Sequence, residues 1–375
     1  MDTPPSPAPS RLASLDILRG ADLFLLVFLQ PVIVSLGSRL DLPWLDGVLR
    51  QFDHAPWTGF RLWDLVMPLF LFMTGAALPF SLDRYAGVRP KGAVYRRIVR
   101  RVVVLFLLGM IVQGNLLGFD PDRIYLYSNT LQAIAVGYSV AAIVVLHCSI
   151  RRQVLVAALL VAIYWVPMTF CGDFTPEGNF AEAVDRWVLG RFRDGAYRGA
   201  DGTWHFAADY AYTWIWSSLT FGATVLLGAF AGRIVKAGRD DPRRTVRRLL
   251  AAGAALALAG WAWSFQMPVI KRLWTCSMTL LSGGYCFLLL GACYWLVDCK
   301  GYGRGLGWLK IYGMNSIAAY MLGECVDFRC VAASVSYGLE RWMGDYYAVW
   351  LDFANYLIVF LILRSMYRRG IFLKV

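Results

Sequence analysis

The chain has few charged residues: Asp, Glu, Lys and Arg together make up only 17% of its 375 residues. A soluble domain carries about 25%. Apolar residues make up 58% of the chain, compared with about 45–50% in soluble domains. This composition excludes a soluble globular enzyme, a disordered chain and a nucleic-acid-binding module. It predicts a membrane protein whose main partner is the lipid bilayer.

Several chemical signatures are also absent from the sequence. The eight cysteines include no CxxC pair and no Cys/His cluster with metal-ligand spacing, so we expect neither a disulfide framework nor a metal centre. HExxH, GxSxG, P-loop and GxGxxG motifs are absent too, and the GYGRGLG run at 301–307 has the wrong spacing for a nucleotide loop. Any catalysis must therefore use other residues.

Long apolar runs are what the sequence does contain. A membrane-spanning helix needs about 20 mostly apolar residues, and ten stretches qualify. We therefore predict an all-α, polytopic membrane protein with about ten transmembrane helices in a single domain over residues 11–375, after a disordered Pro/Ser-rich leader at 1–10. The predicted spans are 17–37, 63–82, 99–117, 130–148, 154–170, 210–232, 247–265, 275–297, 310–326 and 346–364.

The distribution of basic residues predicts the orientation. If the N-terminus is cytoplasmic, 25 of the 37 Lys and Arg residues fall in cytoplasmic segments, as the positive-inside rule requires. An even number of spans then places both termini in the cytoplasm. The external segments are 38–62, 171–209 and 327–345, and the middle one is long enough to indicate function or structure of its own.

Charged and polar residues at membrane depth are costly, so each is a functional candidate. Asp16 and Arg19 are three residues apart at the start of the first span, which equally fits an intrahelical ion pair. Asp64 opens the second span, where a helix N-terminus also stabilises an acid. Gln30 in the first span and Asn315 in the ninth both need polar partners.

The chain has only three histidines, and they differ in setting. His147 ends the fourth span, where a structural role is expected. His205 follows Trp204 in the long external loop, which indicates packing or contact with a substrate.

His54 lies on the external approach to the second span, ten residues before Asp64 and close to Asp53 and Trp57. Because histidine exchanges protons near neutral pH, His54 is a candidate proton acceptor. An ordinary loop histidine is the alternative.

Two segments, SLDILRG at 14–20 and HAPWTGFRLWDLVMPLFLFMTGAALPFSL at 54–82, resemble the transmembrane family of heparan-alpha-glucosaminide N-acetyltransferase. Further pieces fit that family in the same order along nearly the whole chain. They are NTLQAIAVGY at 129–138, LLGAFAGRI at 226–234, IKRLWTCSMTLLSGG at 270–284, YGMNSI at 312–317 and the C-terminal YRRGIFLKV. The chain is most similar to bacterial members, which lack the extra luminal domain.

The resemblance implies a single transmembrane acyltransferase domain in a bacterial inner membrane. Acetyl-CoA would bind from the cytoplasm, and the acetyl group would pass to the amine of a terminal glucosamine-like sugar or glycan on the periplasmic side. The family's active-site histidine falls on His54. Two positions depart from the family pattern: Gln30 replaces an Asn and Ala133 replaces an Arg, which leaves the identity of the acceptor open.

The expected chemistry follows from these residues. His54 would act as the general base, with Asp64 or Asp53 orienting the imidazole and Gln30 or Asn315 stabilising the oxyanion. Direct transfer and an acetyl-histidine intermediate both stay open.

Two further sets of residues complete the predicted site. The donor would be held by cytoplasmic cations and a polar group in the ninth span, namely Arg97, Arg101, Lys374 and Asn315. The acceptor would be contacted by Asp16, Asp53, Trp57, Trp204 and His205.

Two other functional classes remain as alternatives. A ten-span permease for a sugar or small organic anion would also place polar residues inside the membrane, although no pair of broken helices recurs in the two halves. A non-catalytic scaffold explains the apolar mass but not the candidate polar residues. The sequence leaves a homodimer open.

Overall fold

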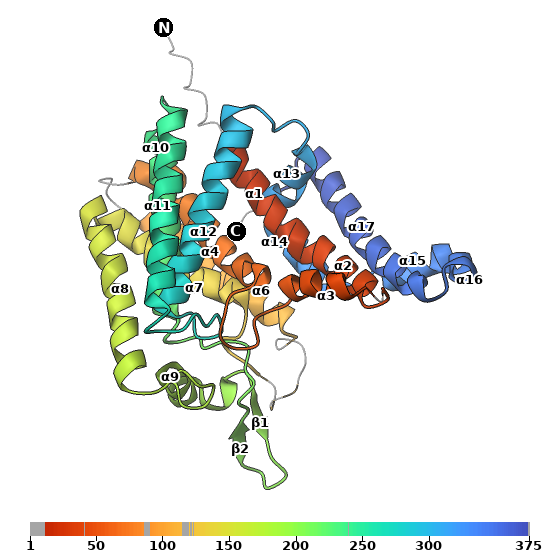
Figure 1. The fold of residues 1–375 in the computed structure, drawn as a ribbon, viewed down its shortest axis with the longest axis horizontal. Helices are drawn as coiled ribbons and strands as arrows, with labels where there is room; N and C mark the ends of the chain where they lie inside the picture. The colour runs from red at the N-terminus through yellow and green to blue at the C-terminus, as the bar shows by residue number, and fades with distance from the viewer. Residues whose placement is uncertain are drawn as a thin grey trace.

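The computed structural model describes residues 12–40, 42–85, 91–114, 120, 122, 124–238 and 240–373. The predicted leader at 1–10 lies outside them. The described chain is a bundle of helices with one two-stranded hairpin (Figure 1), which confirms the predicted all-α class. The helices are α1 Ala13–Phe24, α2 Gln30–Gly37, α3 Pro43–Leu49, α4 Val66–Ala76, α5 Leu78–Leu82, α6 Gly92–Val112, α7 Thr130–His147, α8 Ile150–Phe170, α9 Phe180–Leu189, α10 Ser218–Ala237, α11 Pro242–Trp263, α12 Cys276–Tyr294, α13 Gly307–Met314, α14 Ser316–Cys325, α15 Arg329–Ser336, α16 Glu340–Met343 and α17 Tyr347–Arg368.

Within the described residues, seven helical segments are long and apolar enough to cross a membrane. They are Ala13–Gly37, Leu62–Leu82, Thr130–His147, Ile150–Phe170, Ser218–Ala237, Cys276–Cys299 and Arg329–Arg368. The first and sixth each contain a π-helical turn, at Leu25–Leu29 and Trp295–Cys299. Together they support a polytopic membrane protein.

The other three predicted spans also overlap helices, but with features that a simple apolar run lacks. α6 and α11 each carry four arginines near their N-terminal ends. The predicted span 310–326 is broken at Asn315, which separates α13 from α14. Among the seven segments, the one that corresponds to the predicted span 210–232 becomes helical only at Ser218.

Glycines allow close contact between the helices that carry the site. A Cβ atom at Gly20 of α1 would overlap the carbonyl oxygen of Leu309 in α13, and one at Gly75 of α4 would overlap that of Val225 in α10. Small residues at such crossings let helix backbones approach within a membrane. These contacts fix α1 and α4, which also pack against each other.

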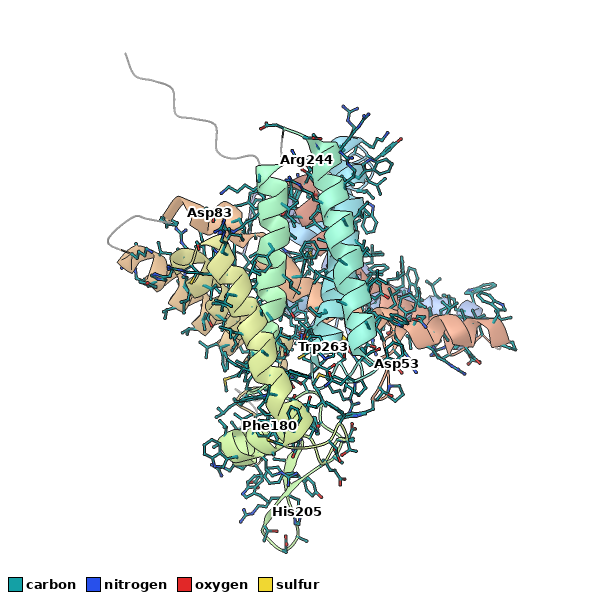
Figure 2. All side chains as sticks on the ribbon, turned by 60° about the vertical axis from the view of Figure 1, so that its left-hand side comes forward. Asp53, Asp83, Phe180, His205, Arg244 and Trp263 are labelled. Atoms are coloured by element: carbon teal, nitrogen blue, oxygen red, sulfur yellow. The ribbon has the colours of Figure 1, made fainter. Side chains whose placement is uncertain are left out.

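The bundle has two opposite ends, which Figure 2 shows clearly. Asp83 and Arg244 lie at one of them, the arginine end, which the predicted topology places in the cytoplasm. His205 and Phe180 lie at the other, the hairpin end, and Asp53 is on the same side of the bundle.

The long loop at 171–209 forms a cap on the hairpin end. It contains α9 and the antiparallel strands β1 (Ala196–Arg198) and β2 (Trp204–Phe206), with Tyr197 opposite His205. Asp185 of α9 accepts hydrogen bonds from the backbone amides of Trp214 (2.6 Å) and Ile215 (2.8 Å) just before α10. Burial raises the pKa of Asp185 to about 7. The expected structure of this loop is thus present and tied to the bundle.

Candidate active site

His54 and Asp64 are in direct contact at the hairpin end. Asp64 is the third residue of the 3₁₀ helix Leu62–Leu65, which leads into α4. One of its carboxylate oxygens lies 2.9 Å from His54 Nδ1. The other accepts hydrogen bonds from the backbone amides of Arg61 (2.9 Å) and Ala55 (3.3 Å). The carboxylate therefore caps its own helix, and its contact with Nδ1 places it where it could orient the imidazole.

A lysine that the sequence analysis did not single out completes this group. Lys271 lies in the loop between α11 and α12, and its Nζ is 3.0 Å from His54 Nδ1 and 3.3 Å from Nε2. The same Nζ is 3.7 Å from Asp64 Oδ1. Lys271 is only 5% exposed. Burial lowers its pKa to about 8, because the charged ammonium loses hydration that Asp64 only partly replaces.

Backbone contacts hold the two loops of this site together. The amide of Gly59 donates to the carbonyl of Val269 (2.8 Å), which joins the His54 loop to the Lys271 loop. Trp274 adopts a positive φ of 54° in the turn that follows Lys271, a conformation that a non-glycine residue rarely adopts. The lysine is thus presented to the imidazole by an unusual turn.

A second buried carboxyl group lies near the lysine. Asp22 of α1 is 2% exposed, and it interacts electrostatically with Lys271. One carboxylate oxygen of Asp22 has no hydrogen-bond partner within the described part of the chain. An acid inside an apolar helix was the available signal for Asp22, and the available signal for Lys271 was its place in the family-like segment IKRLWTCSMTLLSGG at 270–284.

Asp53 and Gln30 support the His54 loop without contacting the ring. Asp53 accepts from the backbone amide of His54 (2.8 Å) and lies 3.6 Å from Arg61 Nη1. Gln30 donates through Nε2 to the carbonyl of Phe52 (3.3 Å). Of the two acids predicted to orient the imidazole, the geometry brings Asp64 to it and not Asp53.

The three aromatic side chains that were predicted to contact the acceptor lie in different parts of the hairpin end. Trp57 donates through Nε1 to the carbonyl of Phe174 (2.7 Å) and packs edge-on against Tyr210, so it links the His54 loop to the cap. Trp204 and His205 lie on β2, where His205 Nε2 is 3.3 Å from Asp201 Oδ1. Figure 2 shows His205 near the tip of the hairpin, well apart from Asp53.

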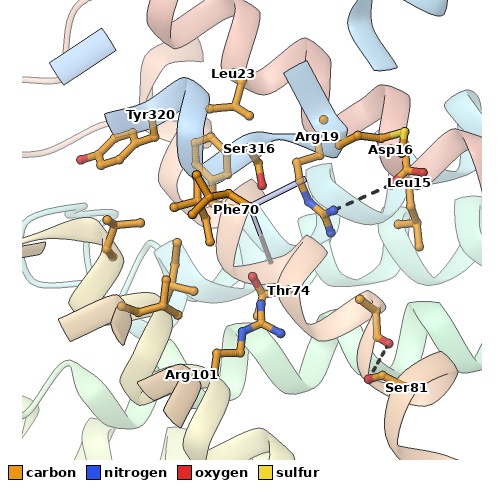
Figure 3. A pocket seen from close by; sticks show the side chains of 18 of the residues that line it. Leu15, Asp16, Arg19, Leu23, Phe70, Thr74, Ser81, Arg101, Ser316 and Tyr320 are labelled. Atoms are coloured by element: carbon orange, nitrogen blue, oxygen red, sulfur yellow. Dashed lines mark hydrogen bonds and ion pairs between the residues drawn. The ribbon is translucent and has the colours of Figure 1, made fainter. Parts of the chain in front are cut away.

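A separate cavity of about 470 Å³ lies between the helices (Figure 3). Its lining is mainly apolar but includes Asp16, Arg19 and Arg101. Asp16 and Arg19 lie 3.9 Å apart, as expected for an ion pair. The Arg101 guanidinium lies 4.4 Å from the centre of the Tyr138 ring, while its buried Nε has no hydrogen-bond partner among the described residues.

The cavity reaches through much of the bundle. Leu12, before α1, and Ser81, close to Asp83, line one part of it, and Thr130, the first residue of α7, lines another. Leu373 lines it as well, so the two ends of the described chain meet at one cavity.

Phe70 lies between the cavity and the histidine site. It lines the cavity and packs against the cluster of Phe52, Trp63 and Val66. Phe52 and Trp63 are close in sequence to His54 and Asp64. The described cavity lining does not include His54, Asp64 or Lys271, so an apolar layer separates the two.

The other residues predicted to hold the acetyl donor do not all line the cavity. Asn315 donates to the carbonyl of Ile371 and accepts from the amide of Leu373, both at 3.2 Å, and so fixes the segment after α17 that lines the cavity. Arg97 contacts the Tyr85 hydroxyl (3.5 Å) and does not line the described cavity. Lys374 lies outside the described residues.

Comparisons with known proteins bear on the family. Residues 11–181 match the family model described as "Heparan-alpha-glucosaminide N-acetyltransferase, catalytic". The human (Homo sapiens) heparan-alpha-glucosaminide N-acetyltransferase is 25% identical over 377 residues, which cover 86% of this chain and 54% of the relative. The mouse (Mus musculus) protein of the same name is 23% identical over 373 residues, or 85% and 54% of the two chains.

This chain spans about half the length of those relatives. The matched catalytic region contains His54 and Asp64, and the longer alignments extend over most of the described bundle. These comparisons support an acyltransferase and agree with the resemblance that the sequence motifs indicated. Both the family model and the relatives show that the chain is similar to the family of heparan-alpha-glucosaminide N-acetyltransferase.

Proposed function

We propose that this protein transfers an acetyl group from acetyl-CoA, held from the cytoplasmic arginine end, to an amine at the periplasmic hairpin end. The observation that carries the proposal is the contact between His54 and Asp64 at one end of a bundle whose interior holds a deep cavity. The relatives are named for N-acetylation of a heparan alpha-glucosaminide, so a terminal glucosamine-like sugar is the proposed acceptor.

The His54–Asp64 pair is suited to proton removal. A carboxylate only accepts hydrogen bonds, so Asp64 favours the imidazole tautomer with hydrogen on Nδ1. The lone pair of Nε2 is then available as a base, as in the histidine of a catalytic triad. An acceptor amine that loses a proton to Nε2 becomes a better nucleophile for an acyl group.

The cavity fits the elongated arm of an acyl-CoA. Its volume lies within the range of small-molecule sites, about 300–1,000 Å³. Its apolar wall suits an extended chain, and the unpartnered Nε of Arg101 is a hydrogen-bond donor for a phosphate or carbonyl oxygen. Bound acetyl-CoA supplies the acetyl group as an activated thioester.

Two of the candidate residues have more limited roles in this proposal. Asn315 uses both its amide oxygen and nitrogen on the segment after α17, so its role in this proposal is to shape the cavity wall. Gln30 is next to the His54 loop, where Nε2 donates one hydrogen to the Phe52 carbonyl, and its second N–H is the side-chain donor that we propose for the oxyanion. Phe70 must move for the cavity to join the His54 site.

The separation of the two sites also bears on the permease alternative. A permease needs a path for a whole solute, whereas a transferase needs only to bring a small acyl group past the layer at Phe70. A cavity with a proton-accepting pair beyond its inner wall favours transfer over passage of a solute.

Purified protein in proteoliposomes provides the test. Labelled acetyl-CoA is supplied on one side and a glucosamine-terminated acceptor on the other, and N-acetylated product is measured by mass spectrometry. We expect product only when donor and acceptor face the arginine and hairpin ends respectively. Movement of unmodified sugar without acetylation would contradict the proposal and support the permease.

A further inference from the structure

The imidazole of His54 has more neighbours than a simple histidine–carboxylate pair. A neutral imidazole offers one N–H donor and one acceptor nitrogen. Asp64 occupies the Nδ1 side at 2.9 Å, which leaves Nε2 as the acceptor. Lys271 Nζ lies 3.0 Å from Nδ1 and 3.3 Å from Nε2, so the lysine is within proton-exchange distance of the imidazole while Nε2 can still face an acceptor.

The surroundings of Lys271 isolate it from solvent. Asp22 of α1, Asp64 before α4 and His54 are the ionisable groups that face it, and the Tyr212 ring centre lies 5.7 Å from its Nζ. With two carboxylates beside it and 5% of its surface exposed, the lysine has protein groups as its proton-exchange partners. Its pKa of about 8 means that ammonium and amine are both populated slightly above neutral pH.

We propose that Lys271 is the proton-transfer partner of His54 in the acetyl transfer. The inference rests on the proposed function and extends it to a residue outside the matched catalytic region. The amine of the acceptor gives its proton to His54 Nε2, and the imidazolium passes that proton to Lys271 Nζ.

The atoms balance over the whole transfer. One N–C bond forms to the acetyl carbon, one C–S bond breaks, and the electron pair of the C–S bond leaves on sulfur. Lys271 gives one proton to that sulfur and is recharged by the imidazolium. At the end His54 is neutral, Lys271 is again an ammonium that carries the proton lost by the amine, and the thiol carries the proton given by Lys271.

Asp22 connects this group to the helix that lines the cavity. It is adjacent in α1 to Leu23, which lines the cavity, and it interacts electrostatically with Lys271. In this proposal Asp22 is a positioning residue for Lys271.

Imidazole NMR tests the pair without any turnover. The chain has three histidines, so ¹⁵N-histidine labelling gives few ring signals, which single His→Gln variants assign. We expect the His54 ring signals to show an inflection near pH 8 that Lys271→Met removes. Identical His54 titration curves in the two proteins would overturn the proposal.

Activity measurements then separate proton exchange from charge compensation. Lys271→Arg keeps the positive charge, but an arginine does not deprotonate in proteins. We expect Lys271→Met and Lys271→Arg each to lower kcat by about 10²-fold or more, with little change in the KM for acetyl-CoA. Recovery of activity by Lys271→Arg would show that only the charge matters and would overturn the inference.

Lys300→Met, at an exposed lysine beyond α12, is the matched control and should keep normal activity. Thermal unfolding of each variant confirms that it is folded. A wild-type protein that shows the coupled titration but transfers no acetyl group would refute the proposed function while retaining the coupled pair.

Discussion

The hairpin end and the central cavity differ in how many polar neighbours surround their charged side chains. At the hairpin end, His54, Asp64 and Lys271 lie within 4 Å of one another, and each has at least two polar neighbours. In the cavity, Arg101 lies among apolar side chains with its Nε free of hydrogen bonds to the described residues.

This difference indicates a division of work. Closely spaced ionisable groups exchange protons, since each can take what its neighbour releases. A cation with an unused donor in an apolar channel instead suits an anionic or carbonyl-bearing ligand. Under the proposed function, the first region would carry out the reaction and the second would retain the donor, and the following variants should affect them separately.

The largest expected effect is at His54. His54→Ala removes the proposed base, so we expect kcat to fall by about 10²–10⁴-fold while binding of acetyl-CoA, measured by calorimetry, stays unchanged. His147→Gln at the opposite end is the control. If His54→Ala kept a near-normal rate, the assignment would be wrong and His205 would become the next candidate.

Asp64→Asn should give a smaller defect in the same region. The amide keeps one acceptor oxygen for its helix but loses the charge that favours the Nδ1–H tautomer. Loss of a hydrogen bond to a charged group costs about 1.5–3 kcal/mol, equivalent to about 10–10²-fold in kcat. Asp46→Asn, at an exposed acid in α3, is the matched control, and equal rates for the two variants would contradict the orienting role.

Arg101→Met should affect the cavity alone. We expect the KM for acetyl-CoA to rise about tenfold, which corresponds to one lost charge-assisted hydrogen bond of about 1.4 kcal/mol, with kcat little changed. Arg100→Met replaces the exposed neighbour on α6 and should leave the KM as it is. A fall in kcat without a change in KM would break the proposed division between the two regions.

The smallest expected effect is a pH dependence of the stability of the cap at 171–209. Because the folded-state pKa of Asp185 is raised to about 7, the folded protein binds this proton more tightly than the unfolded chain does. Its stabilising contribution is complete below the unfolded pKa near 4 and is lost as the pH rises through 7. Hydrogen exchange of α9 should therefore show a more stable cap at pH 5 than at pH 8.

Asp185→Asn should weaken that pH dependence and leave the part due to Asp194, whose pKa burial also raises. Asp201→Asn is the control, because hydrogen bonds to Thr203 lower the pKa of Asp201 to about 2 and it stays ionised from pH 5 to 8. An unchanged pH dependence in Asp185→Asn would contradict this origin.

Sequence reasoning succeeded where the information is local. Apolar length locates the helices, because a membrane requires continuous hydrogen-bonded helices of a certain length. The contact between His54 and Asp64 was also within reach, since only ten residues separate them at the entry to one helix. The break at Asn315 was missed because a few polar residues in a mostly apolar run do not by themselves indicate where a helix is interrupted.

Lys271 shows what the sequence could not provide. It is 217 residues from His54, and its approach depends on the turn at Trp274 and on the pairing of Gly59 with Val269. No periodic pattern encodes such a contact. The division between the cavity and the histidine site likewise depends on how Phe70 packs, which is a property of the assembled bundle.

The anchoring of Leu373 by Asn315 has a consequence for biosynthesis. The cavity wall joins α1, which is inserted early, to a segment that follows α17, so this wall is complete only after that segment has left the ribosome and reached Asn315. A chain interrupted just after Arg368 could retain every described helix yet lack this part of the wall. Helix insertion and completion of the cavity wall should therefore be separable events in time.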